Sequence, residues 1–193
     1  VQVLRGIAAV LVVIIHSEDM MYRYYKLQQT QIFDDARSGV DLFFVISGFI
    51  MTYTISNKNV GWSDFIANRI IRVVPLYWFF TLLLAVLIIF VPNLFSNLSF
   101  DLYQFIYSLL FFPNAQPPIV GIGWTLNYEM FFYLIFSISL LLPKPQGFKY
   151  IWLILVLLVA LGLLISTHSP VFSHITSPLL LEFLAGSIVA RIW

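Results

Sequence analysis

The chain has 193 residues, of which 61% are hydrophobic and 10% charged, and its mean hydropathy is +0.94. Soluble domains carry about a quarter charged residues, so this composition predicts a membrane protein. The net charge is +1, and no lysine- or arginine-rich run is present, which excludes a nucleic-acid-binding surface. The absence of cysteine excludes disulfides, thiol catalysis and cysteine-ligated metals.

Six segments are apolar enough to cross a bilayer, a task that takes about 20 residues. They are residues 3–21, 39–56, 73–92, 123–142, 150–167 and 176–193. Residues 100–113 form a shorter apolar stretch with Asp101 and Gln104 near its start, which favours an interfacial or re-entrant helix. We therefore expect an all-α, polytopic transmembrane bundle that forms a single membrane-embedded domain over residues 1–193.

The distribution of basic residues predicts an orientation in the membrane. With residue 1 in the cytoplasm, seven basic residues lie inside and three outside, as the positive-inside rule requires. The inner group is Arg5, Lys58, Arg69, Arg72, Lys144, Lys149 and Arg191, and the outer group is Arg23, Lys26 and Arg37. The chain begins without methionine and stops inside an apolar run, so we interpret it as part of a larger membrane protein, truncated at its C-terminus.

The first span contains an arginine and a histidine, Arg5 and His16. On a helix they lie within about 20° of one face and about 16 Å apart. A charge inside a membrane segment costs a few kcal/mol and usually faces a protein interior or a pathway. A cleaved signal peptide is the competing interpretation of residues 1–17, but no small-residue cleavage pattern follows them.

The second span combines a carboxylate with small residues. Ser47 and Gly48 would let another helix approach closely, which is how membrane helices pack. Asp41 lies on nearly the same helix face as Gly48 and close in depth to His16, so it is either a functional carboxylate or an outer helix cap.

Two arginines precede the third span. Arg69 and Arg72 are three residues apart and face one side of a helix. We expect Pro75 in the first turn of that helix, where its missing N–H costs nothing. Paired guanidinium groups at a helix start suit phosphate groups, although membrane topology alone also explains positive charge there.

The fourth span holds a buried carboxylate. Glu129 lies six residues into the span, with Tyr133 one turn further on the same face. A carboxylate there needs a partner, which leaves a structural ion pair, a protonated carboxyl group or a catalytic role. Trp124 and Tyr128 suit the aromatic belt at the outer boundary.

Three further titratable groups complete the candidates. Glu182 in the last span is as readily a structural partner as a functional group. We expect His168 and His174 to be loop residues, because two histidines without a nearby carboxylate make a poor metal site. No metal site is predicted.

Taken together, these motifs resemble the membrane acyltransferase-3 family. They occur in the order of that family: Arg5 with His16, then GVDLFFVISGFI, Arg69 and Arg72 before PLYW, WTLNYEMFFYLIF, and LLEFLAGSIVA. The family includes O-antigen and exopolysaccharide acetyltransferases and nodulation-factor acetylases.

The resemblance implies an O-acetyltransferase of the bacterial inner membrane. The acyl donor would be acetyl-CoA from the cytoplasm, and the acceptor a carbohydrate hydroxyl. His16 matches the essential histidine of the family and Arg5 its partner arginine, whereas Arg69 and Arg72 match the pair associated with the acyl donor. Glu129 matches the acidic residue of the tryptophan-led motif.

We therefore predict a membrane-bound O-acyltransferase in which His16 acts as general base and Asp41 or Glu129 orients it. The alternative is a proton-coupled transporter that uses His16, Asp41 and Glu129 as a relay, but no inverted repeat is visible. A non-catalytic membrane anchor would leave the buried charges unexplained.

Overall fold

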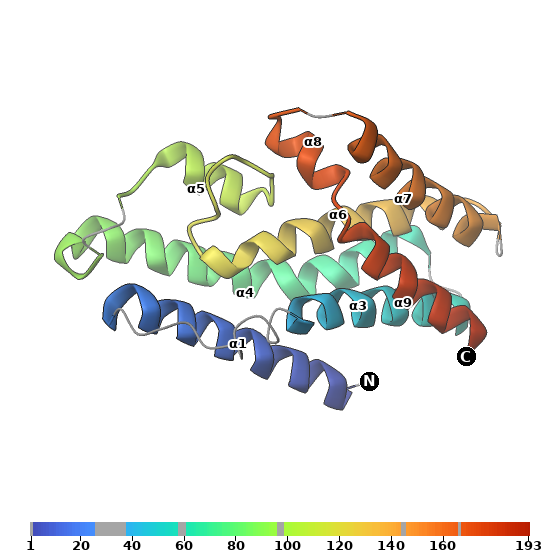
Figure 1. Ribbon diagram of the computed structural model, residues 1–193, viewed down its shortest axis with the longest axis horizontal. Coiled ribbons are helices and arrows are strands. Elements are labelled where there is room, and N and C mark those ends of the chain that lie inside the picture. The colour runs from blue at the N-terminus through green and yellow to red at the C-terminus, as the bar shows by residue number, and fades with distance from the viewer. Residues whose placement is uncertain (1, 26–37, 58–60, 96–98, 144–145, 166) are drawn as a thin grey trace. The chain divides into compact units, whose positions relative to one another are not determined.

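The fold was analysed in a computed structural model, which describes residues 2–25, 38–57, 61–95, 99–143, 146–165 and 167–193. Within these ranges every regular element is a helix (Figure 1). The all-α class predicted from the sequence is therefore confirmed. The chain forms two compact units: unit 1 comprises Val1–Asn59 with Pro178–Trp193, and unit 2 comprises Val60–Ser177.

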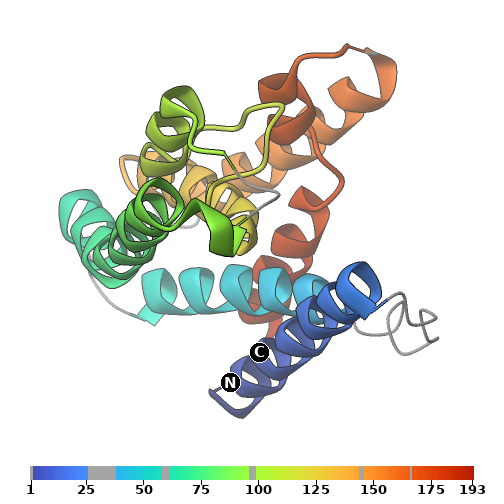
Figure 2. The ribbon, with the colours of Figure 1, turned by 90° about the vertical axis from the view of Figure 1, so that its left-hand side faces the viewer.

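Unit 1 is built from α1 (Gln2–Tyr25), α3 (Ser38–Asn57) and α9 (Leu180–Ile192). Helix α3 packs against both other helices (Figure 2). Its start lies beside the middle of α1, because a Cβ atom added at Gly39 would lie 2.6 Å from the Cβ of Leu11.

Two glycines bring α3 and α9 into backbone contact. A Cβ atom at Gly48 would clash with the carbonyl oxygen of Phe183, and one at Gly186 with the carbonyl oxygen of Val45. The predicted role of Gly48 as a packing notch is thereby confirmed. One turn away, Thr52 donates a buried hydrogen bond of 2.7 Å to the Ser187 hydroxyl, which adds a polar link between the helices.

The contacts between α3 and α9 also fix their relative direction. Near the start of both helices, the carboxyl groups of Asp41 and Glu182 lie next to each other. Near their ends, the ring of Tyr53 lies 5.8 Å from that of Trp193. The two helices therefore run parallel, not antiparallel.

Unit 2 is built around three longer helices, α4 (Trp62–Phe90), α6 (Trp124–Ser139) and α7 (Gln146–Leu164). Its shorter helices are η1 (Pro92–Phe95), α5 (Leu102–Leu109), η2 (Gly121–Gly123) and α8 (Pro170–Ile175). Helices α4 and α6 are antiparallel, because Tyr77 contacts Gly123 at the start of α6, whereas Phe65 packs against Tyr133 near its end.

The predicted number of membrane spans, about six, is somewhat high. In the described part of the chain, four segments are long and apolar enough to cross a membrane: Ser38–Asn57, Trp62–Phe90, Gln146–Leu164 and Pro170–Ile192. Helix α6 has 16 residues, about 24 Å of rise, which is short of a bilayer core of about 30 Å. Helix α1 is long enough, but each 18-residue stretch within it includes three charged residues.

The third predicted span starts earlier than expected. Helix α4 begins at Trp62, has 29 residues and contains Pro75 in its interior, so the prediction that Pro75 occupies a first turn is wrong. No turn signal separates Trp62 from the apolar run, and the helix continues through the proline. At about 43 Å it exceeds the bilayer core, so its first turns, with Arg69 and Arg72, extend toward the interface.

The expected short helix near residues 100–113 is present as α5. Its eight residues rise about 12 Å, which is far too little to cross a membrane. Asp101 caps its start by accepting a hydrogen bond of 2.9 Å from the Tyr103 amide. Trp78 of α4 donates its indole N–H to the Leu109 carbonyl at 2.9 Å, which fastens α5 to α4.

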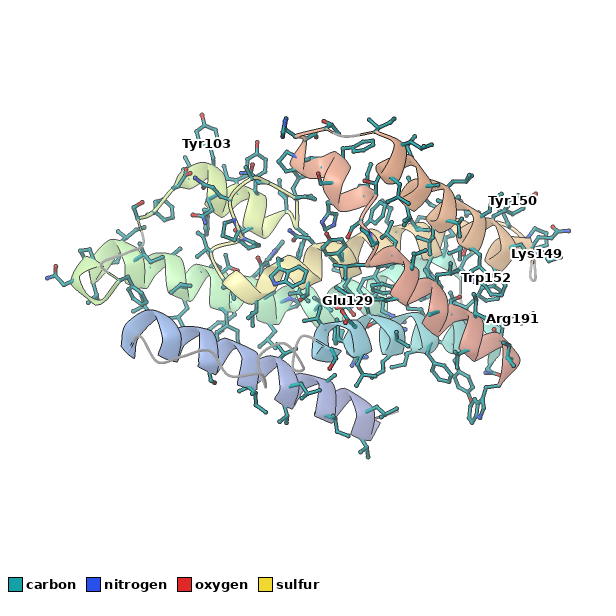
Figure 3. The ribbon with its side chains drawn as sticks, in the orientation of Figure 1. Tyr103, Glu129, Lys149, Tyr150, Trp152 and Arg191 are labelled. Carbon is teal, nitrogen blue, oxygen red and sulfur yellow. The ribbon has the colours of Figure 1, made fainter. Side chains whose placement is uncertain are left out.

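The exposed surface of the long helices is apolar, as a lipid-facing surface requires. Large exposed residues on α4 include Ile71, Leu76 and Phe79. Tyr103 on α5 and Tyr150 near the start of α7 point away from the helices and are 73% and 52% exposed (Figure 3). Such tyrosines suit the two membrane interfaces, and the chain is an integral membrane protein.

Candidate functional site

The polar cluster of unit 2 is centred on Glu129. This side chain is 6% exposed and points into the helix packing (Figure 3). Its Oε1 accepts a hydrogen bond of 2.5 Å from the hydroxyl of Tyr133, which is itself 4% exposed. The spacing of four residues places both side chains on one face of α6, as predicted. The buried carboxyl group thus has the partner that its environment demands.

The predicted arginine pair extends this cluster. The guanidinium carbon of Arg69 lies 5.3 Å from the ring centre of Phe65 and 5.7 Å from that of Tyr133. Arg69 is half-buried, Arg72 is exposed, and both interact electrostatically with Tyr133. Stacking on aromatic rings holds a guanidinium group in place while its N–H donors stay available.

This arrangement has a clear chemical use. Arg69 is oriented by two rings, and Arg72 follows three residues later on the same side of α4. Together they present paired donors and positive charge, which recognise phosphate oxygens in a bidentate manner. Glu129 and Tyr133 lie directly behind them and could hold or relay a proton.

Unit 1 contains a pair of neighbouring carboxyl side chains, which sequence reasoning missed. Asp41 of α3 is exposed, Glu182 of α9 is half-buried, and their carboxyl groups lie next to each other. Two neighbouring carboxyl groups repel each other when both are charged. No local pattern could reveal the pair, because its members lie far apart in the sequence and meet only through the packing of α3 on α9.

Arg5 and His16 both lie in α1, but their side chains are outside the described residues. The backbone still gives the position of His16 along α1 relative to the start of α3. It follows Leu11, the neighbour of Gly39, by five residues, which places the first turn of α3 with Asp41 within about two turns of His16 along α1. Unit 1 thus holds Arg5, His16 and Asp41, and unit 2 holds Arg69, Arg72 and Glu129.

His174 differs from the loop residue that was expected. It belongs to α8, is 8% exposed, and its ring stacks on Tyr128 with a centroid distance of 3.7 Å. His168, by contrast, is exposed. A sequence signal was present in Ser169 and Pro170, since a serine cap followed by proline is typical of a helix start.

No group of three or more His, Asp or Glu side chains within the described ranges is arranged to hold a metal ion. The candidate site is therefore defined by its titratable side chains and its paired arginines.

Comparison with known proteins identifies the family of the chain. A family model described as an acyltransferase domain, acyltransferase-3, matches residues 1–193. The exopolysaccharide production protein ExoZ of Rhizobium meliloti (strain 1021) is 37% identical over 162 residues, which cover 81% of this chain and 50% of that protein. The chain therefore spans about half the length of this relative. No solved structure matches the chain. The chain belongs to the acyltransferase-3 family.

Proposed function

We propose that this protein is a membrane-bound O-acyltransferase that moves an acyl group, acetyl in the simplest case, from coenzyme A to a carbohydrate hydroxyl. Membership of the acyltransferase family supports the reaction class. The name of its relative, an exopolysaccharide production protein, supports a cell-surface or secreted polysaccharide as acceptor. The observation that carries the proposal is the buried Glu129–Tyr133 pair with Arg69 against it.

Arg69 and Arg72 would bind the phosphates of the acyl donor. Arg72 is exposed and free of aromatic packing partners among the described contacts, whereas Arg69 is fixed by Phe65 and Tyr133. This combination provides one preorganised and one adaptable guanidinium group at the start of the long apolar part of α4. In the orientation that we propose, with the N-terminus in the cytoplasm of a bacterial inner membrane, this end faces the cytoplasmic supply of acetyl-CoA.

His16 would act as general base in the transfer step. A free imidazole has a pKa of about 6.5, which suits proton transfer near neutral pH. The acceptor oxygen attacks the acyl carbonyl carbon while His16 takes the hydroxyl proton. The carbon–sulfur bond then breaks, and the imidazolium returns the proton to the departing thiolate of coenzyme A. Arg5, on the same helix face, would stabilise negative charge on the acyl donor or hold the donor in line within the bundle.

The carboxyl groups would orient the base. Asp41 is proposed as its partner, because the first turn of α3 lies beside α1. Glu182, whose carboxyl group lies next to that of Asp41, would help to position it. Glu129 remains the alternative orienting carboxylate, with Tyr133 fixing its geometry.

A proton-coupled carrier is the second candidate, and one observation favours it. Asp41 and Glu182 are neighbouring carboxyl groups within helices of an apolar chain, and such groups mark proton relays in transporters. His16, Asp41 and Glu129 would then form the relay. No phosphate-binding arginine pair is needed by such a carrier.

One experiment separates the two candidates. Purified protein in lipid vesicles is incubated with acetyl-CoA labelled in the acetyl group and with exopolysaccharide from the same cells. The enzyme transfers label to the polysaccharide as an alkali-labile ester and releases free coenzyme A. Proton flux driven by added saccharide, without labelled product, would instead support the carrier.

A further inference from the structure

Unit 2 contains a partly open cavity of about 360 Å³ that the proposed chemistry does not use. It lies between α5, the loop of residues 112–118, the start of α6 and α8. Aromatic rings of Tyr107, Trp124 and Tyr128 line it, together with the polar side chains of Gln104, Asn127 and His174. Its size falls within the range of small-molecule sites, which combine apolar walls with a few placed polar groups.

The wall of this cavity is held in a defined conformation. Helix α5 ends at Leu109. Two residues later, Phe111 has a φ of 55°, in the left-handed region that residues other than glycine seldom adopt. The Phe112 amide bonds to the Tyr107 carbonyl at 3.0 Å and that of Phe111 to Ser108 at 3.2 Å, a Schellman motif. The ring of Phe111 is buried against Tyr77, which stabilises this strained residue.

Hydrogen bonds also fix the loop that follows. Gln104 donates its side-chain amide to the Pro117 carbonyl at 2.7 Å, and the Ile119 amide donates to the Ser108 hydroxyl at 3.0 Å. Proline at residues 113, 117 and 118 further restricts the backbone. The cavity therefore has a preorganised wall, which lowers the entropic cost of binding a ligand.

Two of the lining side chains keep polar atoms without partners. Nε2 of His174 and Oδ1 of Asn127 are buried and accept no hydrogen bond within the described part of the chain. Both residues are more than nine-tenths buried, at 8% and 7% exposure. The His174 ring lies next to the backbone of Asn127. In the neutral tautomer that carries its proton on Nδ1, Nε2 is a hydrogen-bond acceptor.

These atoms define the chemistry of a ligand that the cavity could bind. Two neighbouring acceptors require two donors, and a buried acceptor left unsatisfied costs about 1–3 kcal/mol. Phosphates and carboxylates supply no such donors, and no lysine or arginine lines the cavity to attract them. A neutral polyol supplies hydroxyl donors, and the apolar face of a sugar ring packs on aromatic side chains such as Trp124 and Tyr128.

The position of the cavity suits the acceptor of the proposed reaction. Asn127 precedes Glu129 by two residues on α6, and it lies six residues, about 9 Å along the axis, from Tyr133 at the level of Arg69. The arginine cluster and the cavity thus lie next to different turns of the same helix, α6. The cavity lies toward the end of unit 2 that carries α5 and α8, and Arg69 toward the other end.

We infer that this cavity is the acceptor subsite and that it binds a neutral sugar unit of the polysaccharide through His174 and Asn127. The sugar hydroxyls donate to Nε2 of His174 and Oδ1 of Asn127, while its ring packs between the aromatic side chains. The inference rests on the proposed function for the identity of the saccharide as acceptor, but the binding itself needs no acyl donor.

The test measures saccharide binding separately from acyl transfer. Neutral oligosaccharides from partial hydrolysis of the cells' own exopolysaccharide are titrated into the purified protein without acyl donor. We expect His174→Ala and Asn127→Ala each to raise the Kd about ten-fold through the loss of one hydrogen bond. His168→Ala is the matched control, because this histidine is exposed, precedes His174 by six residues and is absent from the cavity lining.

A third variant controls for misfolding that the two buried substitutions could cause. Ser173 is exposed and lines the cavity, so Ser173→Trp fills the space without altering a buried contact. Ser173→Trp should abolish saccharide binding, while the elution volume and the unfolding temperature of the protein stay those of the wild type. In the transfer assay His174→Ala and Asn127→Ala should raise the KM for saccharide about ten-fold and leave the KM for acetyl-CoA unchanged.

The outcomes distinguish the two proposals. Wild-type acyl transfer together with unchanged saccharide binding in all three cavity variants would overturn the acceptor subsite and leave the enzyme function standing. Failure of the wild type to bind any of the oligosaccharides would overturn it as well. Saccharide binding that depends on His174 and Asn127, without any acyl transfer, would support the cavity and refute the proposed function.

Discussion

Tyr133 donates a hydrogen bond of 2.5 Å to Oε1 of Glu129 from one turn further along α6. The pair is buried, and the guanidinium group of Arg69 lies against the tyrosine ring. A carboxyl group that would otherwise be costly in the membrane interior is thus tied to the arginines proposed to bind the donor. Through Tyr133, the Glu129 carboxyl group and the Arg69 guanidinium group are thus connected within unit 2.

Removal of the Tyr133 hydroxyl should destabilise the protein. Tyr133→Phe keeps the ring beneath Arg69 but removes a hydrogen bond to a buried carboxyl group, so we expect a loss of about 1–3 kcal/mol. Thermal unfolding in detergent measures the effect, with Tyr150→Phe at an exposed position as control. Equal unfolding temperatures for both variants would show that the hydrogen bond contributes nothing.

Loss of either arginine should weaken donor binding. We expect Arg69→Ala and Arg72→Ala each to raise the KM for acetyl-CoA about ten-fold or more, because a charge-assisted bond contributes about 1.5–3 kcal/mol. Arg69→Lys should recover little, since an ammonium group lacks the planar donors that stack on Phe65 and Tyr133. Lys149→Ala, an exposed cation on α7, is the control. Unchanged donor saturation in both arginine variants would refute the docking role.

The contact between α3 and α9 should tolerate no added side chain. Gly48→Ala and Gly186→Ala each place a methyl group against a backbone carbonyl of the other helix, which cannot move as a flexible side chain would. Overpacking of this kind costs about 1–3 kcal/mol. Gly121→Ala is the control, because nothing lies within 4 Å of a Cβ atom there. Wild-type unfolding of both variants would contradict the close packing.

The parallel arrangement of α3 and α9 predicts that α6 crosses the membrane. When two neighbouring transmembrane helices run parallel, the chain between them must cross the membrane an odd number of times. Between α3 and α9, helices α4 and α7 supply only two crossings, so α6 is expected to supply the third. Because the chain lacks cysteine, single cysteines at Gly121 and Leu142, on either side of α6, can be labelled without background. We expect the first to react with an impermeant reagent from outside, and the second only after permeabilisation. Labelling of both from one side would exclude the crossing.

Short-range features of this fold were predictable from the sequence, because a single helix determines them. The pairing of Glu129 with Tyr133 follows from their spacing of four residues, and the notch at Gly48 follows from the small residue in an apolar span. The short helix α5 also follows, since its apolar run is too brief to span a bilayer.

The remaining features depend on contacts between helices that are distant in the sequence. Asp41 meets Glu182 only because α3 and α9 run parallel, and no periodicity encodes that direction. The stacking of Arg69 on Tyr133 depends on the antiparallel packing of α4 on α6. His174 is buried because α8 folds back over Tyr128, which its polar, loop-like sequence conceals.

The central claim is that His16 removes the proton of the acceptor hydroxyl during acyl transfer. The most direct measurement is the rate of label transfer from acetyl-CoA to polysaccharide by membranes containing the His16→Ala variant. The control is Ser17→Ala, which changes the next residue of α1 and removes only a hydrogen bond to the Val13 carbonyl. We predict that His16→Ala lowers turnover by about 10²–10⁴-fold at unchanged protein level, whereas Ser17→Ala keeps wild-type activity. Undiminished turnover of His16→Ala would contradict the mechanism.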